Sequence, residues 1–331
     1  MIHRVLLAVV ALLGAACVSD LEPIEPVALG TAPAETVPST LALPLAGGDG
    51  EARRSSRVEP GVARALITPT GVIVPVVRET AYGYQILTPC GNETTMTWGT
   101  PIVSAEVALD PGHGGEVETG AVGPNGLAEK DLNLAVARAT ARELTDRGVA
   151  VVLTRTSDYR VPLAVRAAIG NQLGVRAMVS IHHNAPVVAR SAHPGTEVFV
   201  QSDSEESRRL GGLVWESVYE ALGQFDVEWV AAGDAGALVV LNRDGEDSYG
   251  MIRRPEMPAV LAELGYLANG PEAELFATDV YVRVAAIALT DAIIAFLDTD
   301  APGAGFVDEP RRFTPDGGTG GSSGCTDPIL E

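Results

Sequence analysis

The chain has 331 residues, of which 46% are hydrophobic and 20% are charged. This length and composition exclude a collagen-like chain and a wholly disordered one, and they allow one large domain with a smaller one beside it. Acidic residues outnumber basic ones by 43 to 23, which gives a formal net charge of −20. Such a surface repels phosphate backbones, so we do not expect nucleic acid to be a partner.

The first 17 residues have the composition of an export signal. His3 and Arg4 precede an apolar run, residues 5–13, that is shorter than the ~20 residues needed to cross a bilayer. Cys17 stands where bacterial lipoproteins carry a lipidated cysteine, but Gly14 replaces the large aliphatic residue usual in that signal. The sequence therefore predicts export to the cell envelope, extracellular or periplasmic. It leaves open whether Cys17 carries a lipid. Such a lipid would be the only attachment to a membrane that we expect.

Two stretches lack the apolar periodicity of packed elements. Residues 18–57 are rich in Pro, Ala, Glu and Gly and predict a flexible linker, and residues 299–331 predict a disordered tail rich in Gly, Ser and Pro. If Cys17 is lipidated, Cys90 and Cys325 remain, and an exported protein could pair them in a disulfide. The sequence leaves that pairing open.

Strand and helix patterns fill the region between these stretches. Residues 58–103 predict a small all-β module of three to five strands, with β-rich segments at 65–67, 71–77 and 82–87. Beyond it, apolar strands are predicted at 105–109, 149–153, 177–181, 196–200, 238–241 and 259–264, and helices at 132–147, 161–173, 205–222 and 279–297. Buried strands that alternate with helices predict an α/β sheet covered on both faces.

Candidate reactive residues follow the ends of the predicted strands, where such sheets gather catalytic groups. His113 lies in a glycine-rich turn, Glu129 opens the first predicted helix, His182 ends an apolar strand, and Glu263 lies within another. Two of them have a plain alternative: His113 could be a solvated loop residue, and Glu129 could simply complement the helix dipole. His183 points to the opposite side of its strand from His182, so only one of the two can face a shared site.

Together these residue types suit a metal-dependent hydrolase. Two imidazoles and one carboxylate form the ligand set of several catalytic zinc sites, which leave a fourth position to water. Zinc lowers the pKa of that water to about 7. A carboxylate such as Glu263 can then take its proton and pass it to a leaving amine. The ligands are far apart in the sequence, so their spacing alone does not decide between this site and the plain alternatives.

A family resemblance adds to this pattern. The chain resembles the zinc-dependent N-acetylmuramoyl-L-alanine amidases of the type-3 family from about residue 104 to 298, in six motifs that occur in order: residues 107–115, 126–133, 153–158, 180–185, 195–200 and 258–269. The resemblance implies one zinc-hydrolase domain over 104–298. It implies a mixed, mostly parallel sheet of about six strands that is covered by helices and preceded by the small all-β module.

The resemblance also implies roles for individual residues. Carried over residue by residue, His113, Glu129 and His182 are the ligands of one Zn²⁺ in the catalytic domain, and Glu263 is the catalytic glutamate. Asn184 and His183 are expected to bind substrate, although His183 stands where the family commonly has a small residue.

The implied activity is hydrolysis of peptidoglycan at the amide between N-acetylmuramic acid and the L-alanine of the stem peptide. Two alternatives stay open at this point. One is a zinc peptidase that cuts stem or cross-bridge peptides, and the other is a non-catalytic cell-wall binding protein in which the β module does the binding. The sequence identifies neither the ligand of the β module nor an activator protein.

Overall fold

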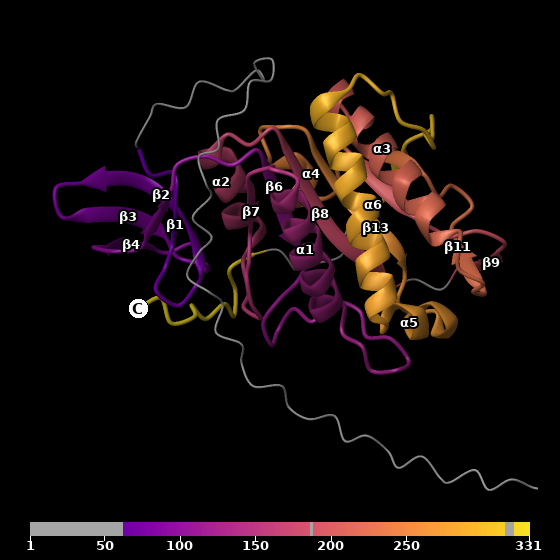
Figure 1. The fold of residues 1–331 in the computed structure, drawn as a ribbon, viewed down its shortest axis with the longest axis horizontal. Helices are drawn as coiled ribbons and strands as arrows, with labels where there is room; N and C mark the ends of the chain where they lie inside the picture. The colour runs from indigo at the N-terminus through magenta and orange to yellow at the C-terminus, as the bar shows by residue number, and fades with distance from the viewer. Residues whose placement is uncertain (1–61, 186–187, 315–320) are drawn as a thin grey trace, which may run out of the picture. The chain divides into compact units, whose positions relative to one another are not determined.

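A computed structural model describes residues 62–185, 188–314 and 321–331 (Figure 1). The expected export signal at 1–17 and the expected linker at 18–57 lie outside the described residues, and so does Cys17.

The central element is a mixed sheet of seven strands in the order β14-β12-β10-β13-β8-β6-β7. Its strands are β6 (Val107–Pro111), β7 (Val151–Leu153), β8 (Ala177–Asn184), β10 (Glu197–Val200), β12 (Ala237–Leu241), β13 (Ala259–Tyr266) and β14 (Arg311–Arg312). Only the β10–β13 pair is antiparallel, and the other neighbours run parallel. The predicted mixed, mostly parallel sheet is confirmed, with one strand more than expected.

Helices cover both faces of this sheet, as predicted (Figure 1). Val107 and Leu109 of β6 face a core shared with α1 (Glu129–Asp146), α3 (Glu205–Leu222) and α6 (Asp279–Asp298). Between them, Ala108 faces the opposite core, shared with α2 (Leu163–Leu173) and α4 (Gly250–Arg253). This alternation follows from the two-residue period of a strand.

Helix α6 is long and apolar enough to cross a membrane by length and composition. It packs along α1 and α3, however, and its residues from Ala285 to Leu297 contribute much of the core on that face. Its apolar character is therefore accounted for by burial inside the domain.

A second sheet of five antiparallel strands precedes the α/β part, in the order β4-β3-β2-β1-β5. Its strands are β1 (Ala65–Ile67), β2 (Ile73–Thr80), β3 (Gly83–Leu87), β4 (Glu93–Met96) and β5 (Thr100–Ile102). Leu66 and Val74 pack in one cluster with Val161 and Val165, which lie before and within α2. The β module therefore shares apolar core with the α/β part.

The expectation of a disordered tail at 299–331 is wrong for the described parts of that stretch. Strand β14 extends the main sheet by pairing with β12, and Phe306 forms a further bridge to Ala237. The Phe306 ring packs against Gly212 and lies 4.7 Å from the Arg208 guanidinium. Composition averaged over this stretch obscures these few apolar and sheet-forming residues. Residues 315–320 lie outside the described chain.

Cys90 and Cys325 form a disulfide that joins the β module to the C-terminal segment. Asp327 reinforces the junction by accepting hydrogen bonds from the Cys90 amide at 2.7 Å and the Thr88 hydroxyl at 2.8 Å. The cysteines are 235 residues apart in sequence, so the cross-link restricts a large part of the unfolded chain.

We expect the Cys90→Ser/Cys325→Ser double variant to lose about 2–4 kcal/mol of unfolding free energy, because removing the cross-link raises the entropy of the unfolded chain. Urea unfolding of oxidised wild type, reduced wild type and the double variant checks this. Reduced wild type serves as the control and should match the double variant. Equal unfolding midpoints for all three would contradict the assignment.

Candidate metal centre

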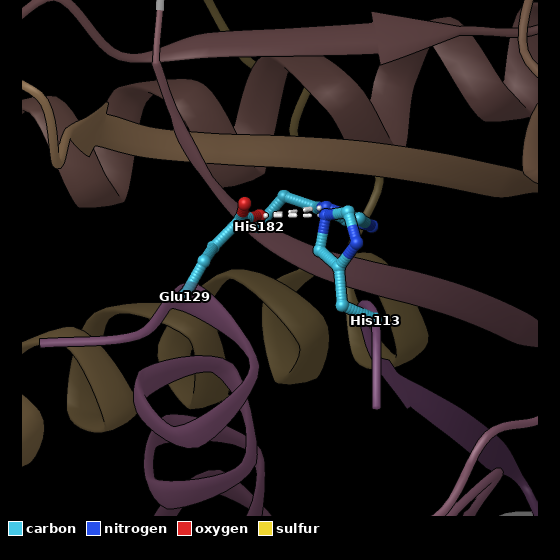
Figure 2. Close-up of side chains that lie close together, drawn as sticks. All are labelled: His113, Glu129 and His182. Atoms are coloured by element: carbon cyan, nitrogen blue, oxygen red, sulfur yellow. Dashed lines mark hydrogen bonds and ion pairs between the residues drawn. The ribbon is translucent and has the colours of Figure 1, made fainter. Parts of the chain in front are cut away.

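Three side chains from separate parts of the chain meet at one point near the carboxyl ends of β6 and β8 (Figure 2). His113 lies in the loop after β6, Glu129 is the first residue of α1, and His182 lies in β8. The Glu129 Oε1 atom is 3.2 Å from His113 Nε2 and 3.0 Å from His182 Nδ1. One ligand atom from each residue lies within 4.8 Å of the others.

Two glycines allow the backbone to approach this cluster closely. A Cβ atom at Gly112 would collide with the His182 ring, and one at Gly120 would collide with Glu129 and lie 2.7 Å from the His113 ring. His113 itself has a φ of 61°, in the left-handed region that side chains other than glycine rarely adopt. Strain of this kind persists where the surrounding structure fixes the residue.

Buried arginines hold the loop that carries His113. Arg166 donates to the His113 carbonyl at 2.6 Å and forms an ion pair with Asp110 at 2.8 Å. Arg155 donates to the carbonyls of Pro111 and Gly112, both at 2.9 Å. Burial raises the pKa of Asp110, but the Arg166 charge and hydrogen bonds from Ser180 and Thr154 outweigh it and bring the net pKa below its usual value. The ionised Asp110 thus anchors the arginine that fixes the loop.

The protonation states of Glu129 and His182 suit metal ligation. Burial raises the pKa of Glu129, but hydrogen bonds to His113 and His182 dominate and hold it well below its ordinary range. Burial lowers the pKa of His182. A carboxylate and a neutral imidazole are the forms in which these side chains bind a metal.

His183 lies on the other side of β8 and is 1% exposed. Its Nδ1 atom is 2.7 Å from Asn133 Oδ1, and its Nε2 atom contacts the hydroxyl of Tyr281. The expectation that His183 binds substrate is therefore wrong: strand alternation turns its ring into the core, opposite His182. Burial lowers the pKa of His183 to about 3, so the ring is neutral at pH 7.

The buried His183 ring takes part in a chain of hydrogen bonds that ends on Glu129. With Tyr281 donating to His183 Nε2, the proton on Nδ1 is donated to Asn133 Oδ1. The Asn133 amide in turn donates to Glu129 Oε1 at 3.2 Å. The chain fixes the orientation of the Glu129 carboxylate.

Glu263 lies on β13, directly opposite His182 on β8 and Glu197 on β10. Its Oε2 atom is buried, with no hydrogen-bond partner among the described residues. Burial, with smaller contributions from the charges of Glu129 and Glu197, raises its pKa well above the ordinary value. A carboxyl group that readily holds a proton beside three ligand atoms is suited to general acid–base chemistry.

Asn184 lies at the carboxyl end of β8, and its amide donates to Glu197 Oε2 at 2.7 Å. The Tyr266 hydroxyl donates to the same Glu197 oxygen at 3.0 Å. Asn184 is half-buried at the rim of the site, where the resemblance places a substrate-binding residue.

The donor set fits a divalent cation. In tetrahedral zinc sites, ligand bonds of about 2.0–2.1 Å separate the ligand atoms by roughly 3.4 Å. The two distances of 3.0 and 3.2 Å from Glu129 Oε1 to the imidazole nitrogens are close to that separation. The buried, unpaired Oε2 of Glu263 adds a proton acceptor beside the cluster.

Comparison with known proteins agrees with this geometry. Residues 107–295 match the family model described as N-acetylmuramoyl-L-alanine amidase. The uncharacterized protein YqiI of Bacillus subtilis is 34% identical over 214 residues, which cover 64% of this chain and 92% of that one. The amidase AmiC of Neisseria meningitidis is 29% identical over 222 residues, 58% of this chain and 53% of its own length.

A solved structure shares the fold. The N-acetylmuramoyl-L-alanine amidase from Clostridium difficile 630 is 26% identical, with a TM-score of 0.51. The match covers 60% of this chain and 98% of that one.

Proposed function

The chain belongs to the N-acetylmuramoyl-L-alanine amidase family, and from this premise we propose that His113, Glu129 and His182 hold one Zn²⁺ and that Glu263 is the catalytic acid–base group. The reaction is hydrolysis of the amide between N-acetylmuramic acid and the L-alanine of the stem peptide in peptidoglycan. The observation that carries the proposal is the convergence of three ligand atoms in the strand neighbourhood of Glu263, whose buried Oε2 atom has no hydrogen-bond partner in the part of the chain that the structure describes.

The roles of the residues follow from their positions. Zinc held by the cluster would polarise the scissile carbonyl and lower the pKa of a water molecule. Glu263 accepts the proton of the attacking water and donates it to the leaving nitrogen of L-alanine. Asn184, at the rim, has an amide suited to orienting a substrate carbonyl.

Analysis of the end groups released from whole sacculi tests the function. We expect new amino termini that belong to L-alanine, with no new reducing sugar ends. Amino termini from other residues would instead indicate a peptidase. A chain that binds sacculi without releasing any end group would indicate a non-catalytic binder.

Peptidoglycan lies outside the cytoplasm, so action on it requires export to the cell envelope. We propose that residues 1–17 direct that export. A lipid anchor on Cys17 stays a prediction.

The hydrogen-bond chain behind Glu129 leads to a prediction about metal affinity. We expect Asn133→Ala to weaken zinc binding by about 10- to 100-fold, because the Glu129 carboxylate loses the amide that orients it. Competition against a chelating dye measures the affinity.

The matched control for Asn133 is Asn171→Ala. Asn171 donates to the backbone carbonyl of Arg254, as Asn133 does to that of Gly112, but it belongs to α2 and no hydrogen bond joins it to the three ligands. The control should bind zinc like the wild type. Wild-type affinity in the Asn133 variant would show that its amide does not support the ligand.

A further inference from the structure

Arg311 reaches the site from outside the family-matched region of 107–295. It lies in β14, at the edge of the main sheet. Its Nε and Nη2 atoms donate to the Asp234 carboxylate at 2.9 and 2.6 Å, and Nη2 also contacts Glu197 Oε1. Its guanidinium lies 5.8 Å from the centre of the Phe199 ring. The side chain is thus held on two carboxylates and one ring.

Glu197 is the partner that links Arg311 to the reacting groups. Its Cα pairs with that of Glu263, which in turn pairs with that of His182, so the three residues form one row across three strands. Residues directly opposite each other on neighbouring strands project from the same face of the sheet. Glu197 is 1% exposed, and a buried carboxylate is costly unless a charge and hydrogen bonds compensate it. Arg311 supplies that charge.

The second oxygen of Glu197 connects to both catalytic strands. It accepts from the Asn184 amide at 2.7 Å and from the Tyr266 hydroxyl at 3.0 Å. Asn184 ends the strand that carries His182, and Tyr266 ends the strand that carries Glu263. The orientation of the Glu197 carboxylate therefore sets the positions of the half-buried Asn184 side chain and the buried Tyr266 side chain.

We propose that Arg311 is a positioning residue for the amidase reaction: its guanidinium holds the buried Glu197 carboxylate in place, and Glu197 in turn holds Asn184 and Tyr266 beside the reacting groups. The inference rests on the proposed function of the site. It assigns to the C-terminal segment, which lies beyond the family match, a role in catalysis in addition to its packing on the sheet.

Three variants and one control test the proposal in the full-length, zinc-loaded protein. Arg311→Met should lower kcat by about 10- to 100-fold while one zinc per chain is retained. Arg311→Lys should recover part of that loss, because one cationic donor can still compensate Glu197. The double variant Arg311→Met/Glu197→Gln should have a kcat at least several-fold higher than that of Arg311→Met. The glutamine is uncharged, so it needs no cation beside it, and its side-chain oxygen still accepts hydrogen bonds from Asn184 and Tyr266.

The neighbouring Arg312→Met is the matched control. Arg312 is exposed in the same strand and should leave kcat and KM unchanged. If Arg311 only stabilises the fold, Arg311→Met should lower the thermal midpoint without changing kcat at saturating substrate. If kcat does fall but the charge on Glu197 is not the cause, the double variant should have the same low kcat as Arg311→Met. Either result would overturn the proposal, as would an equal loss of kcat in Arg312→Met.

A spectroscopic readout separates this proposal from the assignment of function. In ¹⁵N-labelled protein, the side-chain amide signal of Asn184, assigned by its loss in Asn184→Ala, should shift in Arg311→Met and stay unchanged in Arg312→Met. If wild type releases no L-alanine termini, the proposed function fails, and this shift still reports whether Arg311 positions Asn184. An unshifted signal would contradict the positioning role.

Discussion

Replacing Glu263 with glutamine is expected to lower amide hydrolysis by about 10²- to 10⁴-fold while zinc stays bound. Glutamine has nearly the same shape but cannot accept the proton of the attacking water. The Glu263 Oε2 atom, buried and without a hydrogen-bond partner among the described residues, is the acceptor that this change removes. Release of stem peptides from purified sacculi measures the rate, and atomic absorption measures the zinc.

The control for this experiment is Glu274→Gln, which makes the same chemical change at an exposed position on α5 (Gly270–Phe276). It should release stem peptides at the wild-type rate. Near-wild-type turnover in Glu263→Gln would show that another group moves the proton. Loss of zinc from that variant would instead give Glu263 a part in holding the metal.

Removal of the metal is the second change for which we expect a large effect. Dialysis against a dipicolinate-type chelator should reduce hydrolysis to background and lower the thermal midpoint, because a ligand that binds the folded state stabilises it. One equivalent of zinc per chain should restore both. The reason is structural: His113, Glu129 and His182 place three ligand atoms together, and a cation held there would lower the pKa of the water that Glu263 deprotonates.

Glu129→Ala provides the comparison for metal removal. It takes away the carboxylate that contacts both imidazoles, so added zinc should restore neither its activity nor its thermal midpoint. Hydrolysis that persists in chelated protein, with no metal detectable by atomic absorption, would refute the metal-dependent account.

The strands of the main sheet were predictable where they form a continuous run of apolar residues. Strands β6, β7, β8, β10, β12 and β13 all correspond to predicted segments because strands buried on both faces carry continuous apolar runs. The two-residue strand β14 was missed, since Arg311 and Arg312 have no apolar pattern. The short helices α4 and α5 and the β9 (Ala189–Ser191) and β11 (Trp229–Ala231) pair were missed as well, because segments of three to seven residues show no clear periodicity.

The reactive residues were predictable from the sequence because they lie in or just after apolar strands, or, for Glu129, at the start of a helix. His113, Glu129 and His182 are brought together as expected, with Glu263 in the adjoining strand. The family resemblance, and not the spacing, selected His182 over His183. Strand alternation alone left either one free to face the site.

The supporting residues were not predicted, because their partners are distant in sequence. Arg155 lies in the motif at residues 153–158, but only the structure shows that it binds the carbonyls of the His113 loop. The sequence alone likewise does not distinguish Asn133 from other polar residues of its helix, and only the structure shows its hydrogen bond to Glu129. The pairing of Arg311 with Glu197 spans 114 residues and has no local signature. One available signal was Glu197 itself, an acidic residue that opens an apolar strand and needs a partner.

The metal centre is tested most directly by diffraction from crystals of the zinc-loaded protein, with data collected on both sides of the zinc absorption edge. The account predicts one anomalous peak per chain, in bonding contact with His113, Glu129 and His182 and adjacent to Glu263. A peak bound by other residues, or zinc-loaded crystals with no peak at this cluster, would contradict it.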